Sequence, residues 1–479
     1  MHKFIRNFTF SPSHSHWLVS KEIMTIENDE KLKSDSKKLY DATEYLLKKA
    51  KELGADAADC TCDLGQNLEV SVRMGALENV ARAENLGAGL RVMIGKRQAG
   101  ATTSSFSKDA LDELADRVVK MARLATDDPY CGLADSSEIC KSPQDLKLYD
   151  ATIPDVAWLE QQALEAENAA MAIDKITNIA GCGASWDYHY KVYGATNGFI
   201  GGYGSTDWGL YVAPMAQDGD CRERDYDMSA ERFLSKLKPA AQIGKIAGER
   251  AAKRLNPRKI ASTNAPVVIE PRVAKSIIGM MLGAISGSSV ARGISFLKDS
   301  LGKEIFAPNI NIVDDPNIIG GHGSRPFDGE GLNVSKQSII KNGVLNQWLL
   351  NTSAAKQLGL KSTGNASFAQ GGPHGITISN LIVEPSDKSQ ADLIKMANNG
   401  IFVAEAMAPS FNPNNGDYSV GISGFMIENG ILTFPISEIT IACNLFELYK
   451  NLVIANDLEH KGTIDCPSIL VPNMIIAGE

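Results

Sequence analysis

The stretch LEVSVRM, residues 68–74, sets the architecture of the first half of the chain. Its apolar residues alternate with Glu69, Ser71 and Arg73, and successive side chains of a β-strand point to opposite faces of a sheet. The stretch therefore predicts a strand with one buried face. Residues 89–94 and 98–103 also have the pattern of short strands, so we expect them to extend the β-structure.

Helical patterns lie on both sides of these strands. From Lys37 onward, apolar residues recur three or four positions apart, which is the spacing of one helix face, and Gly54 is placed to end that helix. Ser107 is a suitable N-cap for a second helix. The apolar stripe of that second helix consists of Leu111, Leu114, Ala115, Val118 and Ala122. Further helices are expected after Pro154 and over residues 239–255, so the first half is interpreted as helices over a sheet.

The pattern changes after Pro257, where strand-like segments dominate. Two Asn-Gly dipeptides, Asn342-Gly343 and Asn429-Gly430, each lie between apolar runs. Because Asn and Gly tolerate left-handed backbone conformations, each dipeptide predicts a tight turn between antiparallel strands. We therefore expect an α+β protein with two domains, an N-terminal helices-over-sheet domain and a C-terminal β-rich barrel or sandwich domain with few helices. The expected ranges are 1–36 for a flexible N-terminal tail, 37–255 for the first domain and 256–479 for the second.

Size and composition agree with this division and argue against several classes of protein. The 479 residues exceed one ordinary core, and 44% apolar with 22% charged residues is typical of a globular chain. A formal charge of −9, with no basic block, argues against direct nucleic-acid binding. No apolar run reaches the roughly 18 residues that a membrane span needs. The eight cysteines lack Cys-x-x-Cys spacing, which favours reduced thiols and a cytoplasmic location.

The first two dozen residues are basic, with no acidic residue before Glu22. Pro12 and the run His14-Ser15-His16 interrupt any apolar core that a signal peptide would need. We therefore favour a flexible tail, or a start at Met24, over a targeting signal and over metal binding by His14 and His16.

The sequence contains no recognisable catalytic motif of its own. A zinc peptidase generally needs two histidines one helical turn apart, and none of the seven histidines has such a partner, although convergence from distant positions stays open. Ser353 and Lys356 match the Ser-x-x-Lys pattern of some hydrolases, but three other segments match it as well, so a structural role is favoured. The glycine-rich run over residues 320–331 either cradles a ligand or forms a compact loop.

The second half carries six longer motifs. They are Asp314-Asp315-Pro316, the run 320–331 with its Pro-Phe-Asp core, and the segments 362–366, 416–421, 427–430 and 439–445. In this order they resemble the TldD/PmbA family, once labelled modulators of DNA gyrase, and specifically its PmbA (TldE) branch. The resemblance spans most of the chain. It implies a two-domain fold with an α/β half and a β-rich half, and a link to metallopeptidases.

The sequence departs from the zinc-bearing TldD branch of this family. That branch carries His-Glu-x-x-x-His on a helix of the second domain, completed by a cysteine near the C-terminus. The corresponding helix here is expected over residues 272–289 and contains no histidine and no carboxylate, so its side chains cannot hold zinc. Cys466 lies near the C-terminus but lacks the Cys-Gly context, and we expect a packed thiol.

The resemblance therefore implies a subunit that holds no cofactor itself and pairs with a TldD-like subunit that carries the zinc. Together they would enclose an extended peptide, such as a leader peptide, and a homodimer is possible when the chain is alone. Candidate contacts with substrate or partner are His322, Arg325, Asp328, Asn365, Asn412, Asp417 and Ser419. The alternatives are a non-enzymatic regulator of DNA gyrase or of a toxin–antitoxin system, and a metal-independent hydrolase that uses Ser353 and Lys356.

Overall fold

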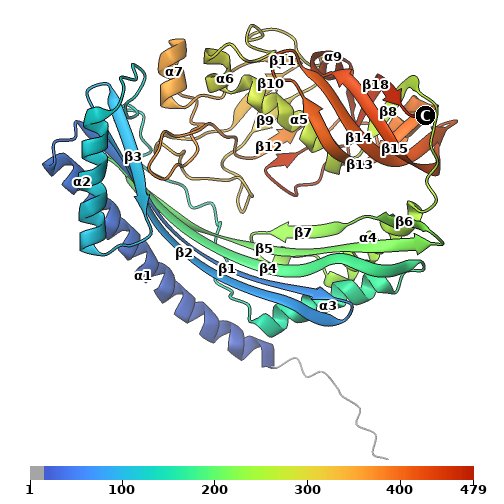
Figure 1. Cartoon of the computed structure of the whole chain (residues 1–479), viewed down its shortest axis with the longest axis horizontal. Coiled ribbons are helices and arrows are strands. Elements are labelled where there is room, and N and C mark those ends of the chain that lie inside the picture. The colour runs from blue at the N-terminus through green and yellow to red at the C-terminus, as the bar shows by residue number, and fades with distance from the viewer. Residues whose placement is uncertain (1–15) are drawn as a thin grey trace, which may run out of the picture.

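The computed structural model describes residues 16–479, with side chains from Glu30 onward except Lys31. The architecture is α+β, as predicted, with one large sheet in the first half and two smaller sheets in the second (Figure 1). The large sheet has seven strands in the order β3-β2-β1-β4-β5-β6, with β7 also paired to β5. Its strands are β1 (Ala57–Arg73), β2 (Ala76–Ile94), β3 (Arg97–Thr103), β4 (Ile176–Ala195), β5 (Ile200–Asp218), β6 (Cys221–Arg224) and β7 (Asp227–Glu231).

The predicted strand over residues 68–74 is the end of the much longer β1. Val70 and Val72 are fully buried, as their alternation predicts, whereas Met74 is 54% exposed. Met74 lies outside the strand because Met74 and Gly75, both with positive φ, form the two-residue turn that leads into β2. The alternation therefore identified the buried face and overran the strand end by one residue.

Four helices cover one face of the large sheet. They are α1 (His16–Glu52), α2 (Lys108–Leu124), α3 (Val156–Met171) and α4 (Ala240–Lys253). The Ser107 hydroxyl accepts a hydrogen bond from the Ala110 N–H, which confirms the predicted cap of α2. The expected tail over residues 1–36 overlaps α1, which begins at His16 and continues to Glu52. His14 lies outside the described residues, and the side chain of His16 is not described.

The large sheet is strongly curved, with its helices on the convex side and its concave side facing the C-terminal half (Figure 1). Even-numbered residues of the central strands, such as Cys60, Cys62 and Val192, are buried against α1 and α2. Leu210 and Val212 of β5 pack against α3 and α4 in the same way. Odd-numbered residues of these strands consequently point to the concave side.

The C-terminal half is built on a six-stranded and a five-stranded sheet. The six-stranded sheet has the order β15-β14-β13-β8-β18-β16, and an additional pairing of β15 with β18 closes it on itself. Its strands are β8 (Thr263–Ile269), β13 (Gly400–Phe411), β14 (Asp417–Glu428), β15 (Ile431–Asn444), β16 (Val453–Ile454) and β18 (Ile469–Ala477). The second sheet, in the order β11-β10-β9-β12-β17, comprises β9 (Ile312–Asp314), β10 (Gln337–Lys341), β11 (Val344–Leu345), β12 (Leu381–Val383) and β17 (Ile464–Asp465).

Five short helices accompany these sheets, namely α5 (Pro271–Ile285), α6 (Gly287–Ala291), α7 (Thr352–Leu358), α8 (Gln390–Ala397) and α9 (Leu445–Asn451). Both predicted hairpins are confirmed. Asn342-Gly343 joins β10 to β11, Asn429-Gly430 joins β14 to β15, and all four residues have positive φ. No helix among the described residues is long and apolar enough to span a bilayer.

Candidate functional site

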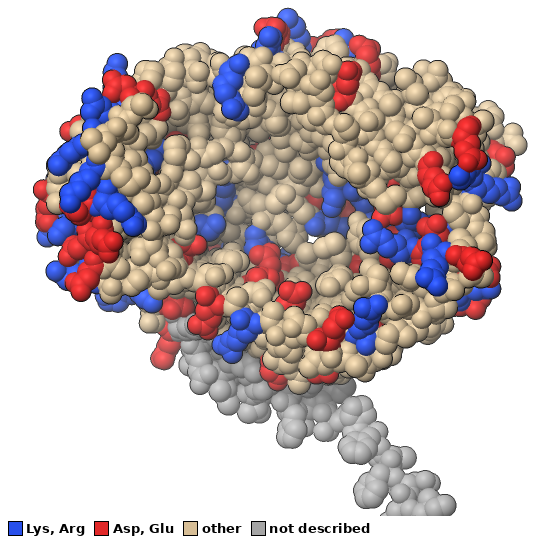
Figure 2. Space-filling model, viewed as in Figure 1, with Lys and Arg blue, Asp and Glu red and all other residues tan. Residues whose placement is uncertain are grey.

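The concave face of the large sheet lines a hollow beneath the C-terminal half (Figure 2). Its central residues are polar, although they lie in the middle of a sheet, and they are at least partly exposed. They are Asp63, Asn67, Asp187, His189, Lys191 and Asp207. Asn67 donates a hydrogen bond to Asp187 across the strands at 2.9 Å. Partial burial raises the pKa of Asp63 and of Asp207 above the ordinary value. The hollow therefore offers a polar surface along several strands.

One end of the hollow is closed by the loop between α7 and β12, which lies directly on β2 and β3. A Cβ atom at Gly89 or at Gly100 would overlap the backbone of Gly371 in this loop. Only glycine permits so close an approach of two backbones. The loop therefore docks on the sheet through backbone contact.

A buried ionic cluster reinforces this contact. The Asp59 carboxylate, on β1, accepts hydrogen bonds from Arg91 Nε at 3.0 Å and from the Tyr193 hydroxyl at 3.2 Å. His374 of the docking loop lies with Nε2 3.1 Å from Asp59 and Nδ1 3.0 Å from the carbonyl oxygen of Ser367. Burial alone would raise the pKa of Asp59, but Arg91 and His374 hold that pKa below the ordinary value. The two halves of the chain thus share one buried carboxylate.

The opposite end of the hollow is held by a second ionic cluster. Arg254, at the end of α4, is 2.6 Å from the Glu405 carboxylate of β13 and 3.4 Å from Asp225. Arg272 of α5 reaches the same Asp225 at 2.7 Å and also contacts Glu270. Burial would raise the pKa of Asp225, yet the two arginines lower it. Because Arg254 and Asp225 belong to the first half and Arg272 and Glu405 to the second, the cluster locks the halves together.

A pocket of about 470 Å³ opens beside this second cluster. Its floor is the concave face of β5, and its wall is formed by β7 and by Glu405. Tyr211, Tyr226 and Met228 contribute apolar surface and are 37% to 47% exposed. The pocket therefore combines apolar walls with a charged end, which is the general character of sites that accept a side chain of a ligand.

The seven residues named from the sequence fall into three environments. His322 lies at the wall of the hollow, where its carbonyl oxygen accepts a hydrogen bond from Arg232, and Arg232 pairs with Asp207 at 2.6 Å. Arg325, Asp328 and Asn365 are 5%, 0% and 1% exposed. The structure therefore brings these three residues together, but it buries them inside the protein.

The buried residues Arg325, Asp328 and Asn365 stabilise the glycine-rich segment over residues 320–331. The Arg325 guanidinium donates to the carbonyl oxygens of Gly364 and Ala366 at 3.2 and 3.0 Å. Asp328 accepts from three backbone N–H groups, and Asn365 donates to Asp314 at 3.4 Å. Of the two readings of this segment, compact loop or ligand cradle, these contacts favour the compact loop.

The remaining residues, Asn412, Asp417 and Ser419, lie away from the hollow, around the turn between β13 and β14. Asn412 and Asp417 are exposed and Ser419 is half-buried. The Asn412 N–H donates to the carbonyl oxygen of Asp417 at 2.9 Å, and the Asp417 carboxylate accepts from the Asn444 amide at 3.1 Å. These contacts shape the turn and leave its outer surface accessible.

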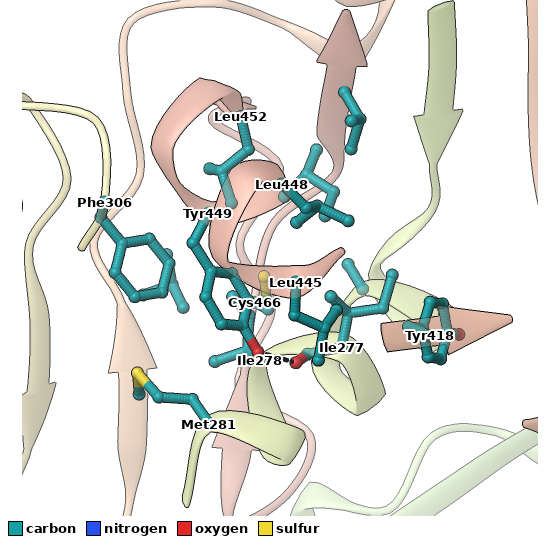
Figure 3. Close-up of a cluster of buried hydrophobic side chains, with 14 of the residues drawn as sticks. Ile277, Ile278, Met281, Phe306, Tyr418, Leu445, Leu448, Tyr449, Leu452 and Cys466 are labelled. Atoms are coloured by element: carbon teal, nitrogen blue, oxygen red, sulfur yellow. Dashed lines mark hydrogen bonds between the residues drawn. The ribbon is translucent and has the colours of Figure 1, made fainter. Parts of the chain in front are cut away.

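The helix expected to face a zinc site in the zinc-bearing branch is α5, and its surroundings are apolar (Figure 3). Ile277, Ile278 and Met281 of α5 pack with Cys466 and Tyr449 in one buried cluster. The Tyr449 hydroxyl donates to the carbonyl oxygen of Ile277 at 2.8 Å, and burial raises the pKa of Cys466, which keeps the thiol protonated.

Zinc requires three or four nitrogen, sulfur or carboxylate ligands, so the side chains around α5 do not fit that ion. No group of three or more His, Cys, Asp or Glu side chains with the geometry of a metal site occurs within residues 16–479 as described. All eight cysteines are free thiols.

Ser353 and Lys356 do not form a nucleophile and base pair in the structure. Both lie on α7, where Lys356 is exposed and Ser353 half-buried. Among the described contacts no hydrogen bond joins them, and the helix is capped by Asn351 and by Glu330, which accepts from Thr352. The contact of α7 with the docking loop is made by Asn351, whose amide donates to the carbonyl oxygen of His374 at 2.7 Å.

The sequence pattern missed the two ionic clusters. Asp59, Arg91 and His374 come from three distant segments, as do Arg254, Arg272 and Glu405. The sequence contained one indication of the first cluster. Asp59 is an odd-numbered residue on the polar face of β1, and Arg91 lies directly opposite it on β2. Nothing local marks His374 or Glu405 as their partners.

Comparisons with known proteins agree with this geometry. The chain matches the models for PmbA/TldA metallopeptidase domain 1 over residues 65–122, the central domain over 149–255 and the C-terminal domain over 262–478. It is 36% identical over 429 residues to Metalloprotease PmbA of Escherichia coli O157:H7, covering 89% of this chain and 93% of that protein. The Metalloprotease PmbA homolog of Haemophilus influenzae is 34% identical over 451 residues, with 93% and 98% coverage.

Solved structures are similar over nearly their whole length. A Bacteroides thetaiotaomicron protein that was named for modulation of DNA gyrase superposes with a TM-score of 0.85 at 26% identity, covering 92% of this chain and 99% of that one. TldE of Thermococcus kodakarensis superposes with a TM-score of 0.79 at 22% identity, covering 91% and 100%, and supports the fold alone. The family predicted from the sequence motifs is confirmed by these matches.

Proposed function

Because this chain belongs to the PmbA/TldD metallopeptidase family, we propose that it is the subunit of such a peptidase that binds no zinc and that helps to enclose an extended peptide. The observation that carries the proposal is the apolar cluster around α5, where Ile277, Ile278 and Met281 meet Cys466. A site that holds zinc needs polar donors at this place, and this one presents hydrocarbon and a protonated thiol. Cleavage then depends on a zinc-bearing relative.

The hollow supports a role in enclosing substrate. Its floor is a curved sheet whose exposed side chains are acidic, basic and amide groups, and its two ends are fixed by the ionic clusters at Asp59 and Asp225. An extended peptide exposes backbone N–H and C=O groups along its length, and a polar sheet face can hydrogen-bond to them without sequence preference. The pocket lined by Tyr211 and Met228 then accepts one larger side chain.

The proposal places this subunit in the cytoplasm with reduced thiols and without direct contact to nucleic acid or membrane. The free state of all eight cysteines supports a reducing compartment. The formal charge of −9 disfavours phosphate backbones.

Reconstitution tests the proposal. The purified chain alone, a His-Glu-x-x-x-His relative alone, and their mixture are compared for cleavage of an unfolded peptide that carries a fluorophore and a quencher. We expect cleavage by the mixture and none by the isolated chain. The matched control is Ser353→Ala, which must leave the activity of the mixture unchanged. Cleavage by the isolated chain rejects the proposal.

A regulatory function without proteolysis remains the competing hypothesis, because some structural relatives are named for modulation of DNA gyrase. The same experiment separates the two. If the mixture gains no activity over the relative alone, and the chain is recovered from cells with a topoisomerase and without a zinc-bearing relative, the regulatory function is correct.

A further inference from the structure

The pocket beside the Asp225 cluster forms where one row of the concave face has short side chains. Ser185 of β4, Gly209 of β5 and Ala230 of β7 lie directly opposite one another in the strand register. Directly opposite residues of antiparallel strands point to the same face, so these three residues form one row across the sheet. The next row contains Tyr211 and Met228, which also lie opposite each other. A floor of small residues therefore lies beside a wall of long apolar side chains.

The Tyr211 ring borders this pocket without filling it. A Cβ atom at Gly181 would lie 3.4 Å from the ring, and one at Gly183 would lie 3.0 Å from it, so the ring lies over the backbone of β4. These two glycines lie opposite positions 213 and 211 of β5, so the ring leans away from Gly209. Tyr211 remains 40% exposed. Part of its surface is therefore available to a ligand in the pocket.

Tyr226 also lines the pocket, and the ionic cluster fixes its position. The Arg272 guanidinium lies 4.8 Å from the centroid of the Tyr226 ring and donates a hydrogen bond to the Tyr226 carbonyl oxygen at 3.1 Å. Arg272 is itself held by Asp225 at 2.7 Å. One face of the ring is therefore covered by a cation, while the residue remains 37% exposed. Two tyrosine rings and the Met228 thioether thus border the floor.

The acidic side chains that line the pocket are already paired with arginines. The pairs are Asp207–Arg232 and Glu405–Arg254, each at 2.6 Å, and Asp225–Arg272 at 2.7 Å. Arg224, a basic residue of the lining, is 60% exposed and lies 3.7 Å from Glu405. A charged group of a ligand would lose its water here without gaining an unpaired partner of opposite charge. The pocket therefore fits an uncharged side chain.

We propose that this pocket binds an aromatic side chain of an extended peptide and that Tyr211, Tyr226 and Met228 determine this specificity. Aromatic rings and a thioether make favourable contacts with a ligand ring beyond the area that they bury. Backbone hydrogen bonds hold any extended peptide, whereas a pocket for one side chain selects among peptides. The inference rests on the proposed function, because that proposal supplies the extended peptide. It adds the class of residue that the substrate must carry.

Peptide binding by the isolated full chain tests the class of side chain. The probes are fluorescein-labelled Gly-Ser peptides that differ at one central residue, which is Phe, cyclohexylalanine, Gly, Lys or Asp. Fluorescence anisotropy gives the Kd of each peptide. We expect the Phe peptide to bind about ten-fold more tightly than the Gly, Lys and Asp peptides, and about three-fold more tightly than its saturated analogue. Equal affinities for Phe and cyclohexylalanine, or tighter binding of the Lys or Asp peptide, overturn the proposal.

Filling the pocket tests its location. Ala230→Trp places a ring on the floor of the pocket and should lower the affinity for the Phe peptide to that for the Gly peptide. Ala81→Trp is the matched control, because Ala81 is half-buried like Ala230 and lies in the same row of the sheet, on β2. The two positions are four strand spacings apart, which is about 19 Å. The control should keep the preference for Phe. A preference that survives Ala230→Trp, or that both variants lose, overturns the proposal.

A change of selectivity provides a second test if Ala230→Trp folds poorly. Met228 is 47% exposed, so the fold tolerates a charged residue there. Met228→Glu adds a carboxylate to the wall and should bind the Lys peptide about five-fold more tightly than the native chain does. Unchanged affinity for the Lys peptide overturns the proposal. Because binding is measured on the isolated chain, the pocket can fail these tests while a mixture with a zinc-bearing relative still cleaves, which separates this inference from the proposed function.

Discussion

Removing the Arg254 guanidinium should destabilise the junction of the two halves more than any exposed charge would. Its side chain is 6% exposed and lies 2.6 Å from Glu405 and 3.4 Å from Asp225. Arg254→Met leaves Glu405 inside the protein without this partner, and breaking one member of a buried pair costs about 3–5 kcal/mol. Asp225 keeps Arg272 at 2.7 Å, so we expect a loss near 3 kcal/mol, at the lower end of that range.

Urea unfolding followed by tryptophan fluorescence and far-UV circular dichroism measures this loss. The matched control is Arg224→Met, because Arg224 lies 3.7 Å from the same Glu405 but is 60% exposed. Exposed pairs contribute about 0–1 kcal/mol, so the control should lose less than about 1 kcal/mol. Adding Glu405→Met to Arg254→Met should recover part of the stability, since the buried Glu405 carboxylate, left with only the long 3.7 Å contact to Arg224, is then removed. Equal losses for Arg254→Met and Arg224→Met would mean that burial of the Arg254–Glu405 pair contributes nothing to the junction.

Three further predictions concern the docking loop and the buried carboxylates. Gly100→Ala places a methyl group where the backbone of Gly371 lies. It should lower the free energy of unfolding by about 1–3 kcal/mol and speed amide exchange in the docking loop. Gly283→Ala, whose added methyl group meets nothing within 4 Å, should leave amide exchange in that loop unchanged. Burial raises the pKa of Asp314 from 3.8 to about 6, so the stability it contributes is present below pH 4 and lost as the pH rises through 6. The native chain should therefore lose up to ~3 kcal/mol more stability than Asp314→Asn between pH 4 and pH 7 in denaturant titrations, whatever constant cost the amide adds at both pH values; equal losses in the two proteins would show that Asp314 does not titrate in this range. Asp328→Asn should lose about 1–3 kcal/mol of folding free energy at pH 7. Asp328 accepts from backbone N–H groups through both carboxylate oxygens, and an amide has one acceptor oxygen. Unchanged stability would be inconsistent with that geometry.

Local patterns in the sequence predicted the elements of this fold well. The alternation around Val70, the Ser107 cap and the two Asn-Gly turns depend on neighbours within a few residues, and each occurs in the structure. The errors lie at element ends. Met74 belongs to a turn, and α1 extends back to His16, since nothing in a polar helical stretch marks its first residue.

The site was harder to predict because its parts are brought together by tertiary contacts. Asp59 and His374 are separated by 315 positions and meet only when the docking loop lies on the sheet. Conversely, Arg325 and Asp328 have the residue types of a binding site, yet they bond to backbone groups that a glycine-rich loop leaves without partners. Residue type and spacing cannot separate these two uses of a polar side chain.

Metal analysis shows whether this chain holds zinc itself or relies on a zinc-bearing relative. We expect no stoichiometric zinc in the isolated chain after purification without chelators, and one zinc per heteromeric pair when the chain is co-purified with a His-Glu-x-x-x-His relative. Plasma mass spectrometry of both samples, normalised to protein concentration, gives the two ratios. One zinc per isolated chain, lost in Cys466→Ala, would mean that this chain carries the metal site itself.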